Sequence, residues 1–180
     1  EGSGTLILAG QYAMTGAMTV STGKLKLGAS GGATNTPLGT IAGGVTVAAG
    51  AVLDLSTFTA GGGSTWEPLT LSGSGIGNGG ALISNSTTGS TFATLAQLSS
   101  KIVNNGAGTL TFTGAVTGGS SFWVGGSGNT TISAALNTAG LLLTKFGSGT
   151  LTLGVASVNT SLVRINGGTL AYGVADALST

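Results

Sequence analysis

The sequence predicts an all-β repeat protein whose short strands stack into a β-solenoid. A glycine-rich turn followed by an alternating strand recurs along the chain, and no window shows the apolar period of a helix. The clearest copy of the unit is Gly147-Ser148-Gly149-Thr150-Leu151-Thr152-Leu153. Successive side chains of a strand point to opposite faces, so Leu151 and Leu153 are expected to share the buried face.

Two further copies of this unit define the repeat. They are Gly2-Ser3-Gly4-Thr5-Leu6-Ile7-Leu8 and Gly106-Ala107-Gly108-Thr109-Leu110-Thr111-Phe112, and weaker copies occur at 23–27 and at 168–172, where Leu170 follows the turn. A unit used this often must stack on its neighbours, because one copy cannot bury its apolar face alone. We expect glycine to serve the corners, where a positive φ or a close backbone approach is needed.

Taken in order, the alternating pattern predicts strands separated by turns rich in glycine and small residues. They are expected near 5–8, 18–20, 24–27, 44–47, 51–55, 69–71, 81–83, 91–98, 101–103, 109–112, 121–124, 130–133, 141–144, 150–153, 162–165 and 169–172. Loops are expected at 29–40, 56–68 and 84–90. The predicted inward residues are Leu6, Leu8, Val20, Leu25, Leu27, Val45, Val47, Leu53, Leu55, Leu110, Phe112, Leu151, Leu153, Ile165 and Leu170.

An internal repeat appears when the sequence is shifted by 145 residues. The shift aligns Gly2, Gly4, Leu6 and Leu8 with Gly147, Gly149, Leu151 and Leu153, and it aligns Leu25 with Leu170. Residues 1–180 therefore read as a single solenoid segment, about one repeat unit and the start of the next. We expect both ends to be covered by adjoining coils of a longer chain or by copies stacked end to end, because an open coil presents unpaired backbone groups.

The composition excludes several classes of function. Charged residues make up 5% of the chain, against roughly 25% in ordinary globular proteins, and the net charge is +1. This gives no electrostatic case for nucleic acid or for an anionic membrane. The sequence has no cysteine and no histidine, which removes thiol chemistry, histidine catalysis and most transition-metal sites. Mean hydropathy is +0.49, but the apolar runs are too short for a membrane-spanning helix.

The ionisable residues do not form a recognisable catalytic or metal site in the sequence. The carboxylates Glu1, Asp54, Glu67 and Asp176 are scattered, whereas glycoside chemistry needs a pair at a defined separation. Asp54 lies between two leucines and is expected to point outward. Arg164 and the pair Lys24 and Lys26 are expected on exposed strand faces. We therefore predict no catalytic residue, no metal ligand and no cofactor.

Aromatic residues are the best candidates for contact with a ligand or partner. Trp66 and the pair Phe122-Trp123 offer flat rings that can stack on sugars or on partner surfaces. The competing interpretation is that these side chains pack in the core or anchor loops.

The last module resembles the autotransporter-associated β-strand repeat. That family's pattern is Leu-x-Lys-x-Gly-x-Gly-x-Leu-x-Leu, then a turn and Gly-Thr-Leu. Here it corresponds to Leu143-Thr144-Lys145-Phe146-Gly147-Ser148-Gly149-Thr150-Leu151-Thr152-Leu153 and Gly168-Thr169-Leu170, and 2–27 is similar to it. The resemblance implies a right-handed parallel β-helix in a bacterial surface or secreted protein, often a passenger of an outer-membrane autotransporter. It implies no shared catalytic residues.

Three functions remain open at this point. The first is structural, with the solenoid forming the stalk, fibre or filament of an extracellular protein. The second is an adhesin module whose loops 29–40, 56–68 and 84–90 bind glycans or a host surface. The third is a polysaccharide-active enzyme on the same fold, which the shortage of acid and base residues disfavours.

Overall fold

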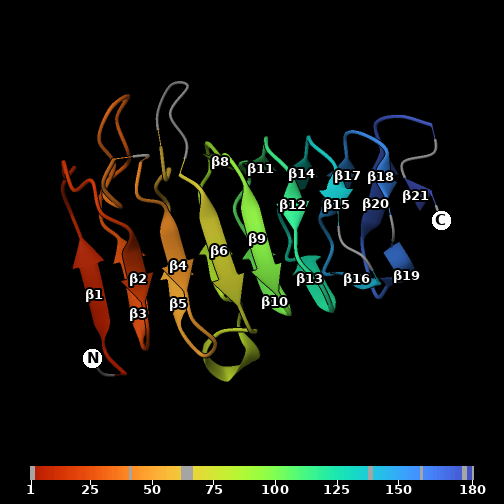
Figure 1. Ribbon diagram of the computed structural model, residues 1–180, viewed down its shortest axis with the longest axis horizontal. Helices are drawn as coiled ribbons and strands as arrows, with labels where there is room; N and C mark the ends of the chain where they lie inside the picture. The colour runs from red at the N-terminus through yellow and green to blue at the C-terminus, as the bar shows by residue number, and fades with distance from the viewer. Residues whose placement is uncertain are drawn as a thin grey trace.

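The computed structural model describes residues 3–40, 42–61, 67–137, 140–158, 160–175 and 178–179. Short strands lie side by side along one long axis, and the chain winds around that axis from one end to the other (Figure 1). Every registered strand pair in these residues is parallel. The predicted all-β parallel solenoid is confirmed.

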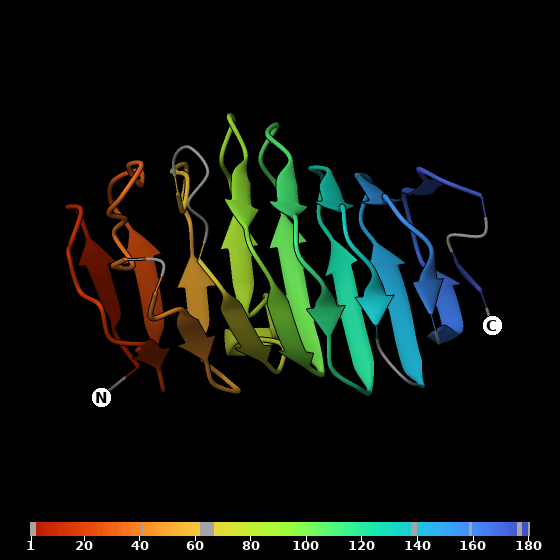
Figure 2. The same cartoon turned by 45° about the horizontal axis from the view of Figure 1, so that its top comes forward.

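Three sheets form the walls of the solenoid, and two of them begin in the first coil (Figures 1 and 2). The eight-stranded sheet contains β1 (Thr5–Leu8), β3 (Lys24–Leu27), β5 (Val52–Asp54), β7 (Leu82–Ser84), β10 (Ser100–Asn104), β13 (Ser121–Gly125), β16 (Leu141–Phe146) and β19 (Thr160–Ile165). The six-stranded sheet contains β2 (Met18–Val20), β4 (Val45–Val47), β6 (Leu69–Ser72), β9 (Leu95–Leu98), β12 (Val116–Thr117) and β15 (Leu136–Asn137).

The five-stranded sheet is confined to the later coils. It contains β8 (Ser90–Phe92), β11 (Leu110–Phe112), β14 (Thr130–Ile132), β17 (Thr150–Leu153) and β20 (Thr169–Tyr172). A further pair joins β18 (Ser157–Val158) to β21 (Leu178–Ser179). The strand predicted over 91–98 is divided into β8 and β9, because the chain turns at Ala93-Thr94. β12 and β15 were not predicted, because two residues are too few to show alternation.

Strand register gives the length of each coil. Ile102 pairs with Val124, Val124 with Lys145 and Lys145 with Ile165, so these coils take 22, 21 and 20 residues. Earlier coils are longer: Leu25 pairs with Leu53, 28 residues on, and Leu53 with Leu82, 29 residues on.

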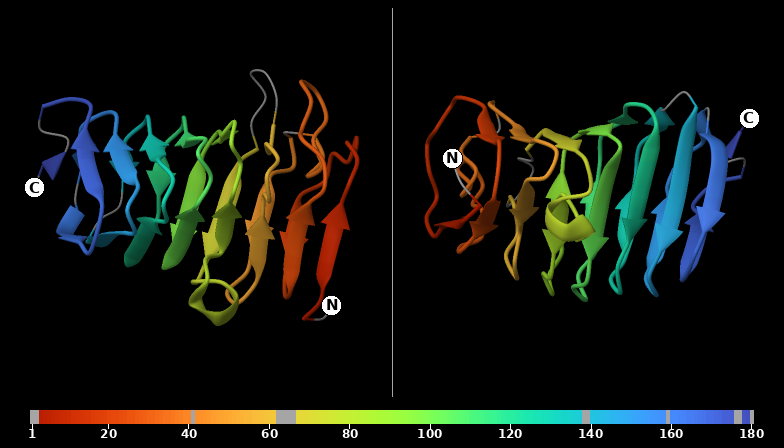
Figure 3. Two further views of the ribbon diagram at one scale, coloured as in Figure 1. Left: turned by 180° about the vertical axis from the view of Figure 1, so that it is seen from behind. Right: turned by 90° about the horizontal axis from the view of Figure 1, so that it is seen from below.

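Loops replace the third wall in the first coils, and they stack on one another as the strands do. In Figure 3 the loops of the early coils project beyond the strands, as does the short helix η1 (Ile76–Asn78). The backbone N–H of Tyr12 donates to the Thr36 oxygen at 3.0 Å, and the N–H of Gly31 donates to the Thr59 oxygen at 2.9 Å. The predicted loop 29–40 is therefore tied to the loops of the coils on either side of it.

The core consists of three apolar columns, one on the inner face of each sheet. The five-stranded sheet contributes Phe92, Phe112, Ile132 and Leu153 in register, and the two phenylalanine rings stack with their centroids 5.9 Å apart. The other two columns are Leu25, Leu53, Leu82, Ile102 and Val124, and Val45, Leu69, Leu95, Val116 and Leu136. All fourteen side chains are buried.

Most of the predicted inward residues are buried, and the exceptions lie in the first and last coils. Leu6 is 62% exposed and Ile165 is 55% exposed, although strand register aligns them with Leu25 and with Lys145. Leu8 and Leu170 are partly buried and pack against the core. The face assignment from alternation is sound for these four residues, but burial also requires a coil on both sides.

Candidate functional site

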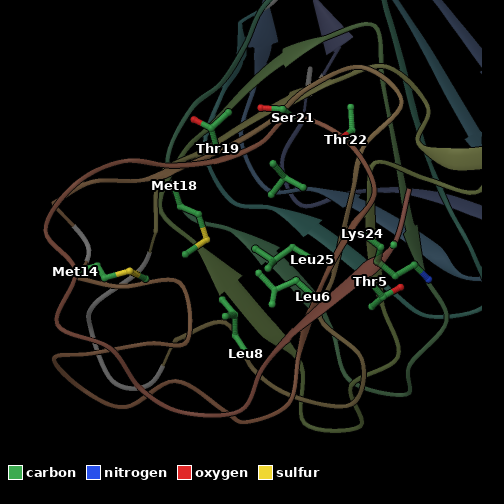
Figure 4. A pocket seen from close by; sticks show the side chains of 12 residues that line it. Thr5, Leu6, Leu8, Met14, Met18, Thr19, Ser21, Thr22, Lys24 and Leu25 are labelled. Carbon is green, nitrogen blue, oxygen red and sulfur yellow. The ribbon is translucent and has the colours of Figure 1, made fainter. Parts of the chain in front are cut away.

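An apolar hollow opens at the coil that contains β1. Its volume is about 630 Å³. Leu6, Leu8, Met18 and Leu25 point toward one another from the surrounding coil (Figure 4). The hollow continues the core columns and is lined mainly by aliphatic and methionine side chains. It is therefore suited to apolar side chains.

A buried ammonium group closes the corner between the eight-stranded and the five-stranded sheets. Alternation places Lys145 on the inward face with Leu143, and its exposed fraction is 1%. Its Nζ donates to the backbone oxygens of Phe146 at 2.7 Å, Gly147 at 3.1 Å and Gly167 at 3.3 Å. Burial lowers the pKa of Lys145. The three carbonyl groups compensate the cost of burying this charge.

Two coils earlier, an asparagine forms hydrogen bonds with the backbone groups of the equivalent corner. Asn104 is fully buried, and its side-chain nitrogen donates to the backbone oxygens of Gly108 at 3.0 Å and of Asn129 at 2.6 Å. Its side-chain oxygen accepts from the N–H of Gly106 at 3.2 Å. At these two Gly-x-Gly corners a polar side chain from the preceding strand bonds the turn, because turn carbonyls that face the interior cannot reach water.

A second buried ionisable group fastens the loops of the early coils. Glu67 is 1% exposed, and its Oε1 accepts a hydrogen bond from the Thr36 hydroxyl at 3.0 Å. The same hydroxyl oxygen accepts from the N–H of Leu38 at 2.9 Å. Among the described residues, Oε2 of Glu67 has no hydrogen-bond partner. Burial raises the pKa of Glu67, and the bond from Thr36 lowers it by a smaller amount.

The remaining described charges are on the outside of the eight-stranded sheet. Lys24 and Asp54 form an ion pair at 3.4 Å, and Asp54 also accepts from the N–H of Ser56 at 2.8 Å. Arg164 is exposed, as predicted. The two carboxylates in the described ranges, Asp54 and Glu67, are therefore engaged separately, and no group of three metal-binding side chains occurs in those ranges.

The three aromatic candidates for ligand contact differ in their positions in the structure. Trp66 lies outside the described residues. Phe122 is fully buried in the core, so its ring is not available to a surface ligand. Trp123 alternates with it and stands half-buried on the outer face of β13, in register with Lys101 and Thr144.

The repeat-defining residues occupy two different walls. Gly2 lies outside the described residues, and Gly4 precedes β1 in the eight-stranded sheet. Gly147 and Gly149, like Gly106 and Gly108, precede strands of the five-stranded sheet, where Leu110, Leu151 and Leu153 are buried. The 145-residue alignment therefore relates segments that lie on different faces of the solenoid.

The buried role of Lys145 was not predicted from the sequence. The signal was present, since Leu143-Thr144-Lys145 alternates directly before a Gly-x-Gly turn and so turns the lysine inward with Leu143. Lysine side chains are usually expected to face solvent, because burying their charge is costly. This expectation conflicts with the inward position that alternation gives Lys145.

Comparison with known families gives one match. Residues 1–27 and 143–171 match the family described as Passenger-associated-transport-repeat. No similar curated protein and no similar solved structure was found. No helix in the described ranges is long and apolar enough to cross a membrane.

Proposed function

We propose that this chain, whose segments 1–27 and 143–171 match the autotransporter-associated passenger-associated-transport-repeat family, is a non-catalytic structural rod. In this proposal the solenoid forms part of a stalk, fibre or filament at the bacterial cell surface, carried by an outer-membrane autotransporter. The observation that carries the proposal is the register of the apolar columns from coil to coil, two from the early coils onward and a third from β8 onward.

The use of the buried ionisable groups supports a structural role. Lys145 closes a corner, and Glu67 fastens a loop through Thr36. An enzyme of this fold would need an acid and a base at one substrate. The described acidic groups, Asp54 and Glu67, instead have separate partners in different parts of the coil.

Exposed apolar side chains at both ends support the proposal that further coils cover them. At one end Leu6 lines the hollow at 62% exposure, and at the other Leu162 and Ile165 are 51% and 55% exposed. β1 and β19 are the two outer strands of the eight-stranded sheet. A further strand on either edge would pair the free backbone groups and bury these side chains together. We propose that the covering coils belong to the same longer chain or to stacked copies.

Electron microscopy and enzyme assays test the structural role. A structural rod should appear as straight particles or as chains of matching units, and it should release no reducing ends or unsaturated products from pectin or alginate. Product release that is abolished by Asp54→Asn or Glu67→Gln would overturn the proposal. Particles of globular outline would do the same.

Hydrogen exchange with light scattering tests the covering of the ends. Exposed end coils should exchange quickly, or the isolated chain should grow in mass with concentration as its ends stack. A monomer of constant mass, whose β1 and β19 amides are as protected as those of β10, would contradict the proposal.

A further inference from the structure

The outer face of the eight-stranded sheet carries an ordered column of side chains. Strand register aligns Lys101 of β10 with Trp123 of β13, Trp123 with Thr144 of β16, and Thr144 with Arg164 of β19. Lys101, Trp123 and Thr144 alternate with buried residues such as Phe122 and therefore face outward, and register with Thr144 places Arg164 on the same face. We call Lys101, Trp123, Thr144 and Arg164 the outer column.

Basic residues gather on this face. Of the five in the sequence, Lys145 is inside the solenoid, and Lys24, Lys26, Lys101 and Arg164 belong to outward positions of the eight-stranded sheet. Asp54 is the one described carboxylate on this sheet, and it pairs with Lys24 three strands away from β10. Around the outer column the described charge is therefore positive.

The flat ring of Trp123 lies between the two cations of the outer column. Lys101 is in register with Trp123, and its Nζ is held by the Asn78 oxygen at 2.7 Å and lies 4.9 Å from the centre of the Phe146 ring. Thr144, which follows Trp123 in the column, is only 4% exposed. Arg164 is exposed at the other end of the column.

We propose that the outer column is a binding site for a linear anionic polysaccharide that lies along the axis of the solenoid. One sugar ring stacks on Trp123, and acidic groups of the same chain meet Lys101 and Arg164. These two residues are three strand spacings apart, or about 14 Å at roughly 4.8 Å per spacing. A linear chain of pyranose rings advances per ring by about one strand spacing. Its acidic groups can therefore match a column that has one residue per coil.

The surroundings favour an acidic glycan over other polyanions. A membrane surface or a nucleic acid is held by many cations, and the outer column offers two. A single aromatic ring flanked by cations suits one sugar ring with charges on each side, because aromatic faces pack on C–H surfaces. This site is on a sheet face, and it is separate from the loops 29–40, 56–68 and 84–90.

Tryptophan fluorescence tests the site. The sequence has two tryptophans, so the full chain with Trp66→Phe reports on Trp123 alone. It is titrated at low salt with a de-esterified oligogalacturonide of ten residues and with a heparin decasaccharide, and a cello-oligosaccharide of ten residues serves as the neutral control. We expect at least one acidic probe to change the emission of Trp123 and to bind more weakly as salt rises. The neutral probe should bind at least tenfold more weakly.

Variants locate the binding. By calorimetry, Trp123→Ala and Arg164→Gln should each weaken binding of the acidic probe about tenfold. Lys26→Gln removes the same charge from the same sheet but outside the column, and it should leave binding unchanged. The melting temperature of each variant, compared with that of the parent, serves as the control for folding. Arg164 is exposed, so its variant is expected to fold.

Several results would overturn the proposal. They are the absence of binding to both acidic probes, equal binding of the neutral probe, or equal losses for Arg164→Gln and Lys26→Gln. Vesicles of phosphatidylglycerol are included as a further arm. Binding to these vesicles without binding to either acidic glycan would assign the face to a membrane surface instead.

Discussion

Nζ of Lys145 donates a hydrogen bond to the backbone oxygen of Gly167, 22 residues later in the next coil, at 3.3 Å. The same ammonium group holds the oxygens of Phe146 and Gly147 in its own turn. One buried side chain therefore closes a corner and joins it to the corner stacked above it. This explains in physical terms why a lysine stands two residues before the glycine turn.

Removing the ammonium group should destabilise the solenoid. Lys145→Met keeps most of the side-chain volume but leaves three turn carbonyls without this donor, so we expect a loss of about 2–3 kcal/mol in the free energy of unfolding. Denaturant unfolding measures it. Lys26→Met, on the outer face of β3, is the matched control and should change stability by less than about 0.5 kcal/mol. Equal stability of the two variants would contradict the role assigned to Lys145.

The inward face of β17 should not accept a charge. Leu151 is fully buried, whereas Thr152 on the same strand faces outward and is half-buried. We expect Leu151→Asp to cost about 4 kcal/mol or more, because it leaves a cavity and an unpaired buried carboxylate. Thr152→Asp should cost about 1 kcal/mol or less. Thermal melts followed by circular dichroism compare the two, and a reversed order would refute the face assignment.

Glycines that are equivalent in the repeat should respond differently to alanine. A Cβ on Gly149 would collide with the backbone oxygen of Gly128 in the preceding coil, whereas a Cβ on Gly4 would meet no atom within 4 Å. Neither residue has a positive φ, so the difference reports stacking alone. Gly149→Ala should lower the melting temperature by several degrees, at about 1–3 kcal/mol. Gly4→Ala should leave it unchanged, and similar melting temperatures would rule out the stacked corner.

Sequence alone was sufficient for the solenoid and for most of its inner face. Alternation in Leu151-Thr152-Leu153 or in Leu110-Thr111-Phe112 specifies both strand and face, because the period of two has no competing explanation there. It was insufficient for β12 and β15, since two residues cannot show a period. It also could not assign walls: Leu6 and Leu151 align in sequence but belong to different sheets, and wall identity depends on the whole coil.

The polar residues inside the solenoid were harder to predict than the apolar ones. Glu67 precedes Pro68 in a segment that reads as loop, and its partner Thr36 is 31 residues away. No local pattern encodes such a pair. The outer column has the same difficulty, because Lys101, Trp123, Thr144 and Arg164 become neighbours only once the coils are in register.

The pH dependence of stability should carry the signature of Glu67. Burial raises the pKa of this carboxyl, so the folded chain keeps the proton to a higher pH than the unfolded chain does. The contribution of the neutral acid is fully present below the unfolded value of 4.5 and is lost as the pH rises through the folded pKa. Within the described residues no cation pairs with Glu67, and its Oε2 lacks a partner.

Glu67→Gln isolates this effect, because glutamine keeps the oxygen that accepts from Thr36 and stays neutral at every pH. We expect the variant and the parent to have similar free energies of unfolding at pH 4, where both side chains are uncharged. By pH 8 the variant should be more stable by about 1–3 kcal/mol, the cost of a buried group left unsatisfied. Urea unfolding at unit intervals from pH 4 to pH 8 measures the difference. A difference that stays constant, or that grows toward acid, would show that ionisation of Glu67 does not oppose folding.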